Sequence, residues 1–106
     1  MMNATRGEPF TIDVSFDCEV RMLSGFTLYF RQGGALVLTK SGRDAVIDTE
    51  GRCAYITLSG GETALFGAFA PVYVQVRAVL ADGEALHSET AEINIVDVLD
   101  TEEGSR

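Results

Sequence analysis

A chain of 106 residues has the length of a single domain, since one hydrophobic core usually holds ~100–200 residues. Its hydrophobic fraction of 46% and charged fraction of 23% are ordinary for a globular protein, which excludes disorder for most of the chain. The 16 acidic and 8 basic residues give a formal net charge of -8, and the basic residues are scattered singly. This pattern excludes nucleic acid and anionic membranes as expected partners, because both require a basic surface.

The location of the chain is predicted from two absences in the sequence. There is no run of ~20 apolar residues, so we expect no membrane span. The first eight residues lack the basic and apolar regions of a signal peptide, which favours synthesis in the bacterial cytoplasm.

The chain has two cysteines, Cys18 and Cys53, and one histidine, which are too few ligands for a zinc site. We expect two reduced, half-buried thiols, and a disulfide between them stays open for an oxidising compartment.

Alternating apolar and polar residues predict strands in the first half of the chain. In residues 10–16 the apolar side chains Phe10, Ile12, Val14 and Phe16 share one face, which predicts a strand lying on a core. Residues 26–31 alternate in the same way, and the glycines at 33–34 indicate a turn. Short strands are predicted next at 35–39, 45–48 and 53–58. One strand about every 8–12 residues is typical of a β-sandwich.

The second half begins with a break in this pattern at residues 59–66. Ser59 and Glu62 have the spacing of a capping box, which predicts one helical turn that presses Leu65 and Phe66 onto the end of the sandwich. The longest strand is predicted at 72–80, followed by a hairpin turn at 81–84 in which Asp82-Gly83 allows the positive φ of a tight turn. The return strand runs from 86 to 95. Its expected core-facing residues are Ala91, Ile93 and Ile95.

These elements predict an all-β fold, an immunoglobulin-like antiparallel β-sandwich of about seven strands. We expect residues 1–99 to form one domain and residues 100–106 to be a flexible acidic tail. The chain has no tryptophan, which excludes an antibody-type domain but not the sandwich architecture. A small barrel is the alternative fold.

The sequence offers little catalytic chemistry. His87 is the only histidine, and the adjacent Ser88 would point to the opposite face of a strand, so the two cannot act as a dyad. The glycines at 60–61 lack the lysine of a phosphate loop. The spacing of the acidic residues near the C-terminus does not match that of a calcium-binding loop; they are Asp97, Asp100, Glu102 and Glu103. We therefore expect no enzyme, no cofactor and no metal site.

Candidate protein-binding residues are easier to find. Tyr29, Tyr55 and Tyr73 lie on or beside the strand face opposite the apolar positions, and exposed tyrosines suit protein contacts. The alternative for each tyrosine is simple packing at a sheet edge. A second candidate is an exposed apolar lip that docks on a neighbour, formed by Val96, Val98 and Leu99. The favoured interpretation of these three residues is that they are the end of the core.

Several segments resemble a known group of proteins. They are residues 23–27 (LSGFT), 56–63 (ITLSGGET) and 74–77 (VQVR), with Asp82-Gly83, Ser88 and the closing 95–99 (IVDVL). Over about residues 7–99 the chain resembles small phage and prophage structural proteins of gram-positive gut bacteria. The resemblance implies a stand-alone immunoglobulin-like module encoded near tail or baseplate components, without catalytic residues.

Two functions are therefore weighed. The first is a non-catalytic virion component of a tail, baseplate or decoration layer, whose partners are phage structural proteins or further copies of itself. The alternative is a surface-binding module that recognises a carbohydrate or receptor on the host. The alternative predicts aromatic side chains in the loops, and the predicted loops contain few.

Overall fold

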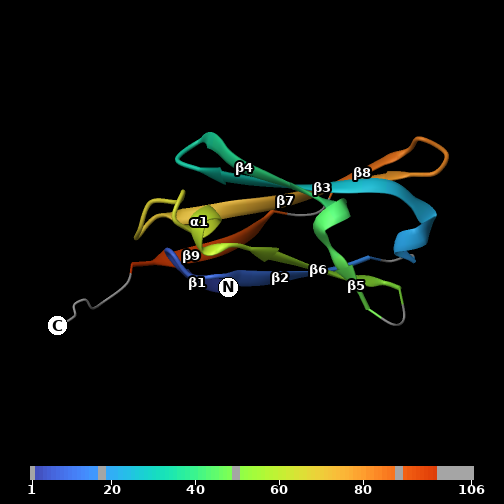
Figure 1. Ribbon diagram of the computed structural model, residues 1–106. Helices are drawn as coiled ribbons and strands as arrows, with labels where there is room; N and C mark the ends of the chain where they lie inside the picture. The colour runs from blue at the N-terminus through green and yellow to red at the C-terminus, as the bar shows by residue number, and fades with distance from the viewer. Residues whose placement is uncertain (1, 17–18, 49–50, 88–89, 98–106) are drawn as a thin grey trace.

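The computed structural model describes residues 2–16, 19–48, 51–87 and 90–97. Within these residues the chain forms two β-sheets packed face to face, as Figure 1 shows. The predicted all-β immunoglobulin-like sandwich is confirmed. The described part contains nine strands rather than about seven, because one strand precedes residue 10 and the predicted return strand is divided in two.

The large sheet has the strand order β1-β9-β7-β3-β4, and β8 pairs with the second half of β7. Its strands are β1 (Met2–Thr5), β3 (Leu23–Gln32), β4 (Ala35–Ser41), β7 (Pro71–Leu80), β8 (Ala85–His87) and β9 (Ala91–Val96). β1 is parallel to β9, and the other pairs in this sheet are antiparallel. The chain thus starts in the large sheet and crosses to the small one.

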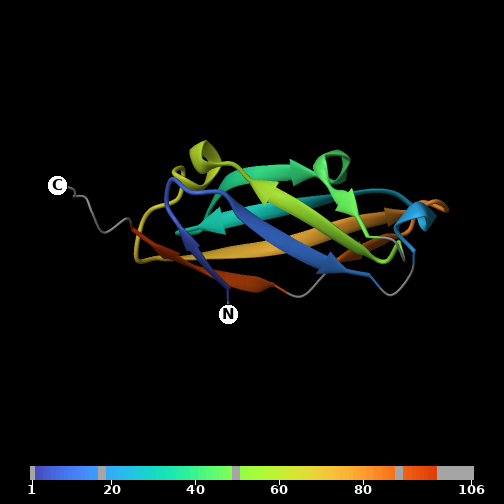
Figure 2. The same cartoon turned by 60° about the horizontal axis from the view of Figure 1, so that its bottom comes forward.

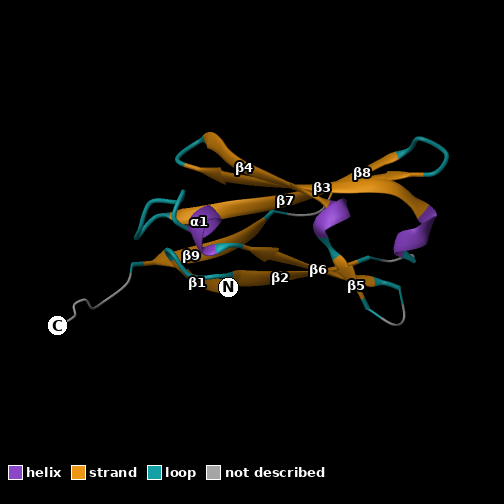
Figure 3. Ribbon diagram, in the orientation of Figure 1, coloured by secondary structure: helices purple, strands orange, loops and turns teal. Residues whose placement is uncertain are grey.

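The small sheet has the order β2-β6-β5, and Figure 2 shows β2 and β6 crossing in front of the large sheet. Its strands are β2 (Phe10–Ser15), β5 (Val46–Ile47) and β6 (Cys53–Leu58). Short helical turns connect strands at η1 (Val20–Met22), η2 (Gly42–Asp44) and α1 (Gly60–Thr63), which Figure 3 colours purple.

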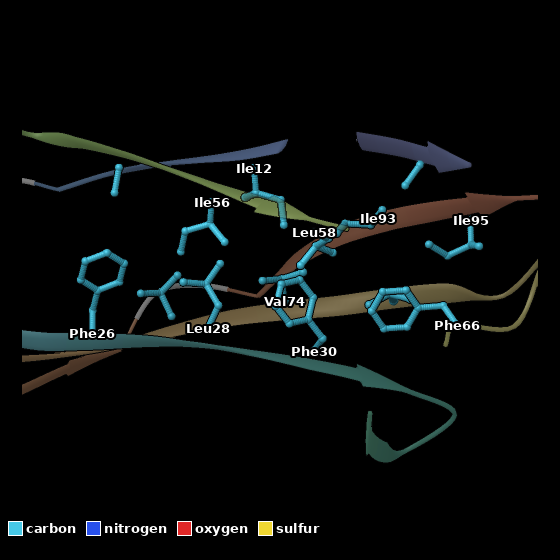
Figure 4. Packing of buried hydrophobic residues seen from close by; sticks show 14 of the residues in the cluster. Ile12, Phe26, Leu28, Phe30, Ile56, Leu58, Phe66, Val74, Ile93 and Ile95 are labelled. Carbon is cyan, nitrogen blue, oxygen red and sulfur yellow. The ribbon is translucent and has the colours of Figure 1, made fainter. Parts of the chain in front are cut away.

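The core lies between the two sheets and follows the predicted alternation. On β3 the side chains of Phe26, Leu28 and Phe30 are buried, and on β7 those of Val72, Val74, Val76 and Ala78. All of them belong to one cluster with Ile12, Ile56 and Leu58 of the small sheet. Figure 4 shows Phe26, Leu28, Phe30 and Val74 facing these three side chains. Ile93 and Ile95 are buried as predicted, but Ala91 is exposed, because the core does not extend to the start of β9.

The helical turn α1 closes one end of the sandwich. Its predicted capping box is confirmed: the Glu62 amide donates to Ser59 Oγ at 3.1 Å, and the Ser59 amide donates to Glu62 Oε1 at 2.8 Å. Phe66 is buried against Phe30, with 6.0 Å between ring centroids. Leu65 is 57% exposed, so the prediction that it packs onto the sandwich is wrong. The turn ends at Thr63, and only one of the two following apolar side chains faces the core.

Candidate functional site

The outer face of the large sheet carries a row of side chains across four strands. Leu36 on β4 pairs with Arg31 on β3, Arg31 pairs with Tyr73 on β7, and Tyr73 pairs with Glu92 on β9. Directly paired residues point to the same face of a sheet. Tyr73 lies between the buried Val72 and Val74, so this is the face that points away from the core. The row combines an aromatic and an aliphatic side chain with two opposite charges.

The loop between α1 and β7 adds two exposed apolar side chains, Leu65 and Phe69, at the end of the sandwich where β7 begins. Phe69 is 80% exposed and has a backbone φ of 65°, which costs a side-chain-bearing residue about 1 kcal/mol or more. Its amide donates to the carbonyl of Ile95 on β9 at 3.0 Å, which places it beside the end of that strand. An aromatic side chain is thus held out into solvent by a strained backbone.

Two long polar side chains fix this loop to the sandwich. Gln32 Nε2 donates to the carbonyls of Gly67 and Ala70 at 2.8 and 3.0 Å, and its Oε1 accepts from the Gly67 amide at 2.7 Å. Arg6 donates to the carbonyl oxygens of Phe66 and Ala64 at 2.7 and 3.2 Å. The loop is therefore anchored both to the end of β3 and to the turn after β1. Its exposed side chains are presented from a supported backbone.

We call these exposed apolar residues the end patch: Leu36, Leu65, Phe69 and Tyr73, which are 48, 57, 80 and 44% exposed. Register and hydrogen bonds place them at the end of the large sheet where β4 begins and β9 ends, on the left in Figure 1. Exposed aromatic and aliphatic side chains at one end of a sheet, with Arg31 between Leu36 and Tyr73, are a candidate protein-binding surface.

The residues that the sequence suggested as an interface are only partly brought together. Tyr29 and Tyr73 share the outer face of the large sheet, where Tyr29 is half-buried. Val96, also half-buried, ends β9 at the same end of that sheet. Tyr55 lies on the small sheet, opposite Asp13 and Val46, so it faces away from the others. The remaining two candidates, Val98 and Leu99, lie outside the described residues.

Sequence reasoning did not identify Leu36, Leu65 and Phe69. Leu36 reads as part of an alternating strand, but an irregularity in the pairing of β3 with β4 beside Phe30 and Arg31 turns it to the outer face. Phe69 lies in a segment without periodicity. The one available signal is an aromatic residue in a stretch rich in glycine and alanine, 67–70.

The ionisable side chains form no catalytic arrangement within the described ranges. His87 is exposed on β8 opposite Arg77, while its neighbour Ser88 is not described. Cys53 is a free, half-buried cysteine, and Cys18 lies outside the described residues. Hydrogen bonding to Cys53 raises the pKa of the Tyr55 hydroxyl, which makes it a poorer acid. Among the residues with coordinates that can be described, no group of histidine, cysteine or carboxylate side chains is arranged to hold a metal ion.

Comparison with known proteins gives the class of fold. No protein-family model and no curated protein matches the sequence. Among solved structures, CopC from Methylosinus trichosporium OB3b matches with a TM-score of 0.58 and 17% identity, covering 93% of this chain and 86% of that one. A fibronectin(III)-like module of Clostridium thermocellum CbhA matches with a TM-score of 0.53 and 16% identity, covering 93% and 88%.

An immunoglobulin-like domain of mouse leukocyte-associated immunoglobulin-like receptor 1, solved as a strand-swapped dimer, matches with a TM-score of 0.52 and 9% identity. That match covers 90% of this chain and 86% of the receptor domain. These likenesses define an immunoglobulin-like or fibronectin-III-like β-sandwich, and at such identities they show the fold alone. None of the described helices is long and apolar enough to cross a membrane.

Proposed function

We propose that this chain is a non-catalytic assembly module that binds another protein through the end patch. The observation that carries the proposal is Phe69, an aromatic side chain 80% exposed on a backbone with φ of 65°. Strained backbone persists where the surrounding structure fixes it, and such positions cluster at functional sites. Gln32 and Arg6 provide that fixation here.

The surroundings of Phe69 support a protein partner rather than a small molecule. Leu36, Leu65 and Tyr73 are exposed at the same end of the sandwich, and Phe69 lines neither of the two described hollows. Exposed apolar side chains interspersed with charges suit a protein interface: Arg31 lies between Leu36 and Tyr73, and Glu92 lies beside Tyr73. A carbohydrate binds best in a concave site, and neither of the two described hollows is lined by a residue of the end patch.

The proposed setting is a phage particle, where the chain would be a tail, baseplate or decoration component. The support for this setting is the sequence resemblance to small phage structural proteins over about residues 7–99. The phage proteins in contact with the end patch would be neighbours in the tail or further copies of this chain. The immunoglobulin-like fold is compatible with this role and does not by itself select it.

The proposal is tested by substituting Phe69→Asn in the prophage and measuring incorporation of the chain into purified particles by peptide mass spectrometry. Asparagine tolerates positive φ, so the folded chain should lose no stability and gain roughly 0.5–1 kcal/mol. Incorporation should nevertheless fall at least about tenfold, as expected when an aromatic interface residue is lost.

The matched control is Val46→Thr, which removes an apolar side chain that is 68% exposed on the small sheet. Its incorporation should equal that of the wild type. Two results would contradict the proposal: absence of the wild-type chain from intact particles, or equal incorporation of Phe69→Asn and the wild type.

A further inference from the structure

An open hollow of about 480 Å³ lies on the large sheet away from the end patch, near the end of β7. This volume is within the range of small-molecule sites, ~300–1,000 Å³. The lining residues that matter for its chemistry are Ser24, Gly25, Thr27, Ser41, Arg43 and Arg77. They come from β3, the end of β4, η2 and β7.

Two features leave space for the hollow: β4 does not pair with the first residues of β3, and Gly25 has no side chain. β4 pairs with β3 only over residues 27–32, so residues 23–26 of β3 have no described strand on that side. At Gly25 an added Cβ would meet no atom within 4 Å, so this glycine leaves open space above the strand. Val79 pairs with Gly25 and forms an apolar wall on the neighbouring strand.

The charge of the hollow is opposite to that of the whole chain. Two arginines, Arg43 and Arg77, line it, and its described lining contains no acidic residue, although acidic residues outnumber basic ones 16 to 8 overall. Within the described part of the chain, neither guanidinium takes part in an ion pair. Two arginines in a concave site, with no ion pair to any carboxylate that the structure describes, provide donors in the planar geometry that oxyanions accept.

Hydroxyl groups complete the arrangement. Ser24, Thr27 and Ser41 belong to the lining and carry hydroxyl groups, and the Ser41 oxygen accepts from the Arg43 amide at 3.2 Å. The Ser24 hydroxyl donates to the carbonyl of Val79 at 3.1 Å, which leaves its oxygen available as an acceptor. Ligand hydroxyls can both donate to and accept from such groups.

We propose that this hollow binds an acidic sugar, or a similar small hydroxylated ligand, whose carboxylate, sulfate or phosphate group is held by Arg43 and Arg77. The site is independent of the end patch and of the proposed assembly function. It adds ligand recognition to a chain whose other surface features suit protein contacts.

The test is titration of the ¹⁵N-labelled chain followed by NMR, with three probes: glucuronate, glucose 6-phosphate and glucose. Saturable shifts are expected at the amides of Gly25, Thr27 and Arg43, with a dissociation constant on the order of 1 mM at low salt for at least one anionic probe. Binding by one anionic probe alone identifies the oxyanion that fits. Glucose should bind at least about tenfold more weakly, since it lacks the charge.

Two variants separate the site from non-specific attraction. The double variant Arg43→Gln/Arg77→Gln should weaken binding at least about tenfold. In Gly25→Val the added Cβ meets no atom within 4 Å and both arginines are kept. Valine suits a strand, so the fold should persist while the side chain occupies the hollow and binding is lost. The control Arg52→Gln removes one positive charge that does not line the hollow and should bind as the wild type does.

Three results would overturn the proposal. They are the absence of saturable shifts with both anionic probes, equal binding of glucose, and wild-type affinity in both the double arginine variant and Gly25→Val.

Discussion

At the scale of single residues, the Glu62 carboxylate both caps α1 and joins this turn to β4. It accepts the Ser59 amide at the start of α1 and both oxygens accept Lys40 Nζ of β4, at 3.0 and 3.1 Å. The hydrogen bond from the Ser59 backbone, followed by the interactions with Lys40, lowers the pKa of Glu62 below its usual value of 4.5. A lowered pKa in the folded state means that ionised Glu62 stabilises the fold.

Substituting Glu62→Gln should therefore lower the free energy of unfolding by about 1 kcal/mol at pH 7, because Lys40, whose side chain is only 14% exposed, loses its charged partner. The wild-type advantage is present above the unfolded-state pKa and is lost as the pH falls through 4.5 toward the lower folded-state pKa. Urea unfolding at pH 7 and pH 3 measures both effects. The control Glu84→Gln, in the exposed hairpin turn, should change little, and a difference that persists undiminished at pH 3 would refute this account of Glu62.

At the scale of elements, α1 is positioned by close backbone contact with the turn between β1 and β2. Thr63 is buried and its hydroxyl donates to the Glu8 carbonyl at 2.8 Å, while it accepts the Gly7 amide at 3.0 Å. A Cβ added at Gly60 would lie 2.5 Å from the Gly7 carbonyl oxygen, so only glycine permits this approach. The neighbouring Gly61 has no such restriction, since its nearest contact would be Ser59 Oγ at 3.8 Å.

These two glycines form a matched pair for mutation. Gly60→Ala should destabilise the fold by about 2 kcal/mol or more, because the turn and α1 must separate. Gly61→Ala should be neutral or stabilising by up to about 1 kcal/mol, since alanine favours a helical turn. Thermal unfolding of both variants checks the contrast. Equal effects of the two substitutions would show that α1 is not held against the turn as described.

The same scale shows which elements can be predicted from sequence. Strict alternation identifies β2, β3, β6 and β7, because each has one face on the core. β1 was not predicted, since Ala4 is its one fully buried side chain and its partner β9 is distant in sequence. Tyr73 could be proposed for the interface from its place in the alternation. The exposure of Phe69 and the hollow lined by Arg43 and Arg77 (the arginine hollow) could not be predicted from sequence. Both depend on loop conformation and on which strands end beside each other.

At the scale of the whole molecule, the large sheet carries two different surfaces. The end patch lies where β7 begins, with Tyr73, and the arginine hollow lies where β7 ends, with Val79. Between these two surfaces the large sheet packs on the small sheet through one core, in which Phe30, Leu28 and Ile56 are completely buried. A rigid sandwich of this kind can bind a protein at one end while leaving the other end accessible.

The most direct test of the assembly function is hydroxyl-radical footprinting of the chain, free and within purified particles. We predict that oxidation of Phe69 and Tyr73 falls several-fold in the particle, because a partner covers the end patch. Tyr55 on the small sheet, 39% exposed, serves as the internal reference and should be oxidised equally in both states. Equal oxidation of Phe69 and Tyr73 in the free and particle-bound chain would contradict the account, and so would protection of Tyr55 in their place.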